Sequence, residues 1–82
     1  MWEEGTFSID GFEFYYEAKV FDEPSPFGID GGRISKLAIY RVLSKSPLAV
    51  AQFIGYDREW YLTADDSYIG QKVLEYMLET YA

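Results

Sequence analysis

The residues with the most potential for chemistry in this sequence are two arginines and three nearby acids. Arg33 follows a glycine pair, and Arg58 lies between Asp57 and Glu59. A guanidinium offers a planar fork of donors that matches a carboxylate or phosphate, so either arginine is a candidate for recognising such a group on a partner. Combined with Asp30, Asp57 or Glu59, the same arginines would instead form the site of a small carboxylate-based enzyme.

A structural role for both arginines is the main alternative. Each could pair with Asp22, Asp30 or Asp57 and hold the segment 22–33 against the rest of the fold.

The composition favours a protein without enzymatic activity, cofactor or metal. The chain has no cysteine and no histidine, which excludes a disulfide scaffold, a thiolate nucleophile and a Cys or His zinc site. It also lacks the side chain that most often serves as a general base near neutral pH.

The charge is acidic and unevenly distributed. The formal net charge is −7, with eight acids and only Lys19 among residues 1–30, and five bases but only Asp57 among residues 31–58. This balance opposes binding to nucleic acid, which is a dense polyanion. It leaves open an acidic surface that imitates nucleic acid and inhibits a DNA- or RNA-binding protein.

The segment 22–33 does not fit a known ligand loop. Its glycines precede a β-like run rather than a helix, which argues against a phosphate loop, and its acids lack the alternating spacing of a calcium loop. A flexible linker is one interpretation. The prolines and glycines also suit a loop of defined shape, in which Phe27 and Ile29 pack on the sheet and residues 30–32 form the exposed tip.

The strands and the helix that must hold this loop can be predicted from the turn-forming residues and from the spacing of the apolar residues. Asp10-Gly11 between alternating apolar runs predicts a type I′ hairpin that pairs Ile9 with Phe12 and Phe7 with Phe14. The remaining pattern predicts two more strands, a short edge strand and a helix, in which Gly70 allows close approach to the sheet. The single domain 1–82 then consists of a hairpin 2–21, a loop 22–33, strands 34–43 and 48–56, a possible strand 59–62 and a helix 66–81.

This order predicts an α+β fold. We expect an antiparallel four- or five-stranded β-meander with one C-terminal α-helix packed on one face. Strands 34–43 and 48–56 are apolar on both faces, with Val50 and Ile54 expected on the same one. A single helix cannot cover both faces, so either the loop covers the second face or another chain does. We therefore expect a homodimer centred on these strands.

The central run resembles the hallmark of a family of small bacterial proteins of unknown function. The run is Ala18-Lys19-Val20-Phe21-Asp22-Glu23-Pro24-Ser25, then Phe27-Gly28-Ile29, then Gly31-Gly32-Arg33-Ile34-Ser35-Lys36-Leu37, with Tyr56-Asp57-Arg58 and Trp60 further on. The resemblance implies an origin in Gram-positive bacteria and their mobile elements. It implies no activity.

Together these features predict a protein-interaction module with the loop near its partner surface. The candidate partner-binding residues are Phe27, Asp30, Arg33, Arg58 and Trp60. The sequence has no apolar run long enough to cross a bilayer and no secretory signal at its start, so we expect a cytoplasmic protein without membrane contact.

Overall fold

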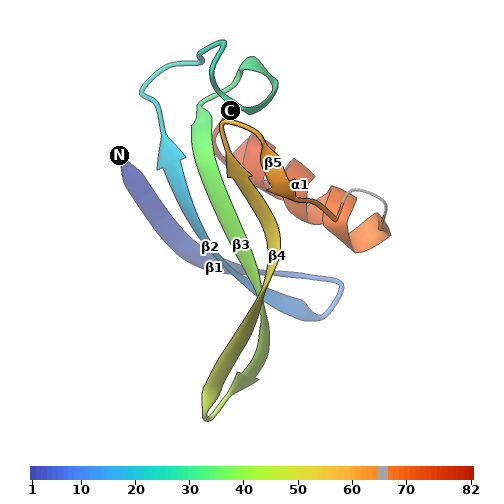
Figure 1. Cartoon of the computed structure of the whole chain (residues 1–82). Coiled ribbons are helices and arrows are strands. Elements are labelled where there is room, and N and C mark those ends of the chain that lie inside the picture. Colours follow the sequence, from blue (N-terminus) through green and yellow to red (C-terminus); the bar gives the residue numbers. More distant parts are fainter. Residues whose placement is uncertain (65–66) are drawn as a thin grey trace.

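The computed structural model describes residues 1–64 and 67–82, which form one antiparallel sheet with one helix on its inner face (Figure 1). The strands follow chain order across the sheet, so the predicted α+β meander is confirmed. The elements are β1 (Trp2–Ile9), β2 (Phe12–Val20), the 3-10 turn η1 (Ile29–Gly31), β3 (Ile34–Lys45), β4 (Leu48–Asp57), β5 (Trp60–Leu62) and α1 (Tyr68–Thr80). Within residues 1–64 and 67–82, no helix has the length and apolar character that a membrane crossing needs.

The first hairpin has the predicted register. Ile9 lies opposite Phe12, and Phe7 lies opposite Phe14. Asp10 and Gly11 both have positive φ, at 51° and 85°, as a type I′ turn requires. Local turn chemistry and the alternation of apolar residues therefore specify the same pairing.

Helix α1 is capped by Ser67, whose Oγ accepts a hydrogen bond from the Gly70 N–H at 2.9 Å. The expected helix start at residue 66 lies outside the described residues. Gly70 does allow a close approach, but to a different neighbour from the one predicted. A Cβ at Gly70 would lie 1.7 Å from the carbonyl oxygen of Ala64, so the crowding is with the segment before the helix and not with the sheet.

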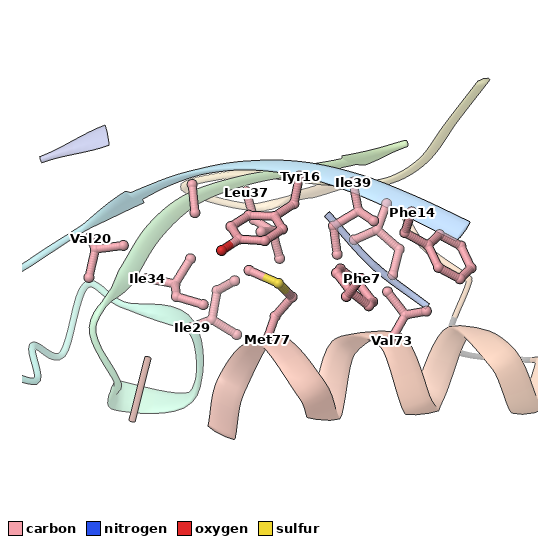
Figure 2. Close-up of a cluster of buried hydrophobic side chains, with 12 residues drawn as sticks. Phe7, Phe14, Tyr16, Val20, Ile29, Ile34, Leu37, Ile39, Val73 and Met77 are labelled. Carbon is pink, nitrogen blue, oxygen red and sulfur yellow. The ribbon is translucent and has the colours of Figure 1, made fainter. Parts of the chain in front are cut away.

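The core lies between the helix and the inner face of the sheet (Figure 2). Val73 and Met77 of α1 are fully buried against side chains from β1 to β4. The strand and loop residues in this cluster are Phe7, Phe14, Tyr16, Ala18, Val20, Ile29, Ile34, Leu37, Ile39 and Ile54.

Within residues 1–64 and 67–82, no helix lies on the outer face of the sheet (Figure 1). The predicted face of Val50 is wrong, because the pairing of β3 with β4 shifts between Ile39 and Tyr40. Ile39 lies opposite Ile54, whereas Tyr40 lies opposite Gln52, so one extra residue of β4 is accommodated at Phe53. This bulge changes the alternation, and Val50 is 42% exposed while Ile54 is buried.

The loop between β2 and β3 has a defined shape closed by backbone hydrogen bonds. The Phe21 N–H donates to the Arg33 carbonyl at 2.7 Å, and the Ser25 N–H donates to the Gly32 carbonyl at 3.0 Å. Ile29 is buried in the core, as predicted, but Phe27 is 79% exposed and does not pack on the sheet. Ile29 anchors the loop on the helix side, and Val50 on the outer face remains 42% exposed.

Candidate functional site

The largest cavity near the loop lies where the loop meets the ends of β2, β3 and β4. Its volume is about 600 Å³. We call it the loop cavity, and its lining residues are Lys19, Phe21, Pro26, Phe27, Ser35, Lys36, Tyr56 and Arg58. Three cations and three aromatic rings therefore border one hollow in a chain whose net charge is −7.

Two of the cations are held next to each other by the pairing of β2 with β3. Lys19 lies directly opposite Lys36 in the register of these strands. Like charges at directly opposite positions destabilise a sheet. Lys36 also forms an ion pair with Asp57 across β3 and β4, with the Lys36 Nζ 3.7 Å from a carboxylate oxygen. Both side chains of that pair are well exposed, so it offsets the repulsion only in part.

Arg58 completes the basic side of the cavity from the turn between β4 and β5. Its φ of 67° is unusual for a residue with a side chain. The turn is closed by a hydrogen bond from the Asp57 N–H to the Glu59 carbonyl at 3.0 Å. Within the described part of the chain, neither Lys19 nor Arg58 takes part in an ion pair.

The aromatic side of the cavity comes from two elements. Phe21 and Phe27 belong to the loop, and Phe27 is among the most exposed large apolar residues of the protein. Tyr56 belongs to β4 and packs edge-on against Trp60, with ring centroids 4.9 Å apart. An exposed phenylalanine next to these cations combines apolar surface and positive charge at one position.

A second, smaller cavity is lined by Trp60. Its volume is about 200 Å³, and it is bordered by the loop, β4, β5 and the start of α1. Its lining residues are Asp30, Ile54, Trp60, Thr63, Ala64, Gly70 and Leu74. This helix cavity is mostly apolar.

The structure divides the five predicted partner-binding residues among three locations. Phe27 and Arg58 line the loop cavity, whereas Asp30 and Trp60 line the helix cavity. Arg33 lines neither. Its Nε donates to the Phe21 carbonyl at 2.9 Å, so it joins the two ends of the loop through the backbone and not through the carboxylate partners considered above.

Sequence reasoning missed Lys19, Lys36, Phe21 and Tyr56 as members of one site. One signal was present, because Lys19 is the only base among the first 30 residues. The alternation of β2 assigns it to the solvent face. Its neighbour Lys36 becomes identifiable only when β2 and β3 are paired across the loop, and that pairing is shifted by one residue next to Lys19.

The acids considered for catalysis do not meet in one cavity. Asp30 borders the helix cavity, Asp57 is paired with Lys36, and neither Asp57 nor Glu59 lines either cavity. The Ser35 hydroxyl in the loop cavity donates to the Lys19 carbonyl at 3.2 Å. Among the residues that the structure describes, no group of acids is arranged to hold a metal ion.

A family model described as a domain of unknown function, DUF7678, matches residues 1–82. No curated protein and no solved structure matches the chain.

Proposed function

The chain belongs to the DUF7678 family, a domain of unknown function, and we propose that it is a non-enzymatic protein-interaction module. In this proposal the loop cavity binds a carboxylate-bearing segment of a partner protein. The family assigns no activity, so the proposal rests on the cavity itself. Bacterial origin and a cytoplasmic location stay predictions from the sequence.

The observation that carries the proposal is a group of three cations beside exposed aromatic surface, two of which have no ion-pair partner among the described residues. Lys19 and Lys36 are directly opposite each other, and Arg58 adds a third positive charge from a neighbouring turn. A bound carboxylate would relieve the repulsion between the lysines and accept hydrogen bonds from the guanidinium. An aromatic or aliphatic residue next to that carboxylate would pack on Phe27.

A protein segment suits this surface better than a polyanion or a small substrate. A nucleic acid would meet the repulsion of a chain with net charge −7. The carboxylate-based enzyme considered from the sequence would need an acid in the cavity, and none of the described residues that line the loop cavity is an acid. A short acidic peptide needs only a few positive charges and an apolar contact.

The acidic-mimic alternative has less support. Such a mimic needs its acids aligned on one face at the spacing of phosphates. Glu4 lies opposite Glu17 on the outer face, but Lys19 and Lys36 occupy neighbouring positions on that face. The positive charges interrupt the surface that a mimic would need to keep negative.

The test uses a blocked peptide of alternating Asp and Phe, titrated into the ¹⁵N-labelled full chain. We expect amide shifts concentrated at Lys19, Phe27 and Arg58. The same peptide with Asn in place of Asp should bind at least about tenfold more weakly, because a hydrogen bond between charged groups contributes about 1.5–3 kcal/mol.

Two charge-matched variants distinguish peptide binding in the loop cavity from a general effect of net charge on binding. Arg58→Gln and Lys45→Gln remove one positive charge each, but Lys45 lies at the far end of β3 and pairs with Glu13. Arg58→Gln should weaken binding about tenfold, and Lys45→Gln should leave it nearly unchanged. Equal losses in both variants, or equal binding of the Asp and Asn peptides, would contradict the proposal.

A further inference from the structure

Among the described residues, no strand pairs with most of the outward edge of β4. In the sheet order, β4 lies between β3 and β5, but β5 pairs with it only at Gly55 and Tyr56. Gln52 limits the free part at one end, because its Nε2 donates to the Ile54 carbonyl at 3.4 Å and to the Tyr61 hydroxyl at 2.7 Å. The turn at Ser46-Pro47 limits the free part of β4 at its other end. The free edge therefore runs over residues 48–52.

This edge is apolar and uncharged. Leu48 is 71% exposed and Val50 is 42% exposed. Ala49 and Ala51 are exposed as well. Residues 46–56 contain no charged side chain. The opposite edge of the sheet differs, because β1 carries Glu3 and Glu4. Charged residues on an edge strand discourage pairing with another chain, and the free edge of β4 has none.

We propose that this edge is a dimer interface, in which residues 48–52 pair in antiparallel with the same segment of a second copy. A two-fold axis near Val50 would join the two sheets into one. The unpaired backbone N–H and C=O groups of each edge would then bond to the partner. Leu48 of one copy would then lie opposite the last residue of the segment 48–52 in the other copy.

Two features favour a second copy over another protein strand. The first is length, because β5 occupies the sheet edge from Gly55 onward and only a short strand fits beside residues 48–52. Residues 48–52 of a second copy form a segment of matching length, because the turn at Pro47 ends it on one side. The second is charge. Two chains with net charge −7 repel each other, and pairing through a neutral protruding segment keeps their acidic surfaces apart.

The test is sedimentation velocity of the full chain from micromolar to millimolar concentration, with variants at each sheet edge. An interface of this length is small, so we expect a dimer that dissociates on dilution. Ala49→Lys introduces a charge on the free edge and should give a monomer throughout. Ser8→Lys introduces the same charge on β1 and should leave the dimer intact. Circular dichroism melting curves establish that both variants are folded.

A cysteine crosslink tests the position of the axis. The chain contains no cysteine, so Val50→Cys and Ser8→Cys each introduce a single thiol. Under mild oxidation, Val50→Cys should form a disulfide-linked dimer, and Ser8→Cys should not. A wild-type monomer at millimolar concentration, a dimer that persists in Ala49→Lys, or equal crosslinking of both cysteine variants would overturn the proposal. Residues 48–52 lie outside the loop cavity, so Ala49→Lys should leave binding of the acidic peptide unchanged.

Discussion

Lys19 of β2 lies directly opposite Lys36 of β3, and both lie on the outer face of the sheet because they alternate with buried residues. Opposite-charge pairs at such positions contribute roughly 0.2–1 kcal/mol, and like-charge pairs are destabilising. A sheet with two lysines in register therefore gives up stability at this point. Binding of an anion between them would explain why the arrangement is tolerated.

Replacing Lys19 with Gln should raise the stability of the protein while it weakens binding of the acidic peptide. Removal of one charge relieves the repulsion with Lys36, and we expect about 0.5 kcal/mol of added stability. Urea denaturation measures this effect. Lys72→Gln is a useful comparison, because Lys72 pairs with Asp10 at 3.6 Å and its loss should not stabilise the protein. Destabilisation by Lys19→Gln would argue against repulsion in the native sheet.

Substitutions at Ile29 and Phe27 should have different effects, one on the stability of the protein and the other on peptide binding, although both residues lie in the same loop. Ile29 is 3% exposed and Phe27 is 79% exposed. Ile29→Ala should lower the free energy of unfolding by about 3 kcal/mol, because it leaves a cavity in the core. Phe27→Ala should change stability by less than about 0.5 kcal/mol and still weaken binding of the Asp-Phe peptide. Denaturation and peptide titration of both variants check the pair, and a large stability loss from Phe27→Ala would contradict the exposed position.

Gly70→Ala should destabilise the protein although alanine favours helices. The added Cβ would lie 1.7 Å from the Ala64 carbonyl oxygen, so the segment before α1 or the helix must move. We expect a net loss of about 2 kcal/mol, since strain of this kind exceeds the gain of about 1 kcal/mol in helix propensity. Glu75→Ala, on an exposed position of the same helix, is the matched control. Thermal melts compare the two variants, and equal melting temperatures would show that the crowding relaxes without loss.

Stability should fall above pH 10 partly because of Tyr81. Burial and the hydrogen bond between its hydroxyl and that of Tyr16, at 2.8 Å, raise the pKa of Tyr81 well above its usual 10.0. The unfolded chain releases this proton near pH 10, whereas the folded chain retains it to higher pH, so stability is complete below pH 10 and decreases above it. Tyr81→Phe should be less stable near neutral pH but lose less stability across this alkaline range. Parallel pH dependence in the two proteins would exclude the effect.

The fold was largely accessible from the sequence because its main signals are local. Asp10-Gly11 specifies a turn with two positive φ angles, and the alternation on each side of it selects one register. The helix after Ser67 follows from a capping side chain and an apolar period of 3.6. Where a signal depended on pairing between strands, prediction failed. Val50 and Ile54 have the right spacing for one face, but the bulge at Phe53 puts them on opposite faces.

By itself, the sequence determined the order of the strands, the single helix, the separation of acidic from basic segments and the absence of cysteine and histidine chemistry. These are properties of residue type and short-range spacing. Only the tertiary structure decided which residues share a cavity. It placed Lys19, Lys36, Arg58 and Phe27 around the loop cavity and Trp60 in the lining of the helix cavity. It also showed that Arg33 donates to a backbone carbonyl. The reason is that these contacts depend on strand register and on how the loop closes, and both are set by packing among residues that are distant in the chain.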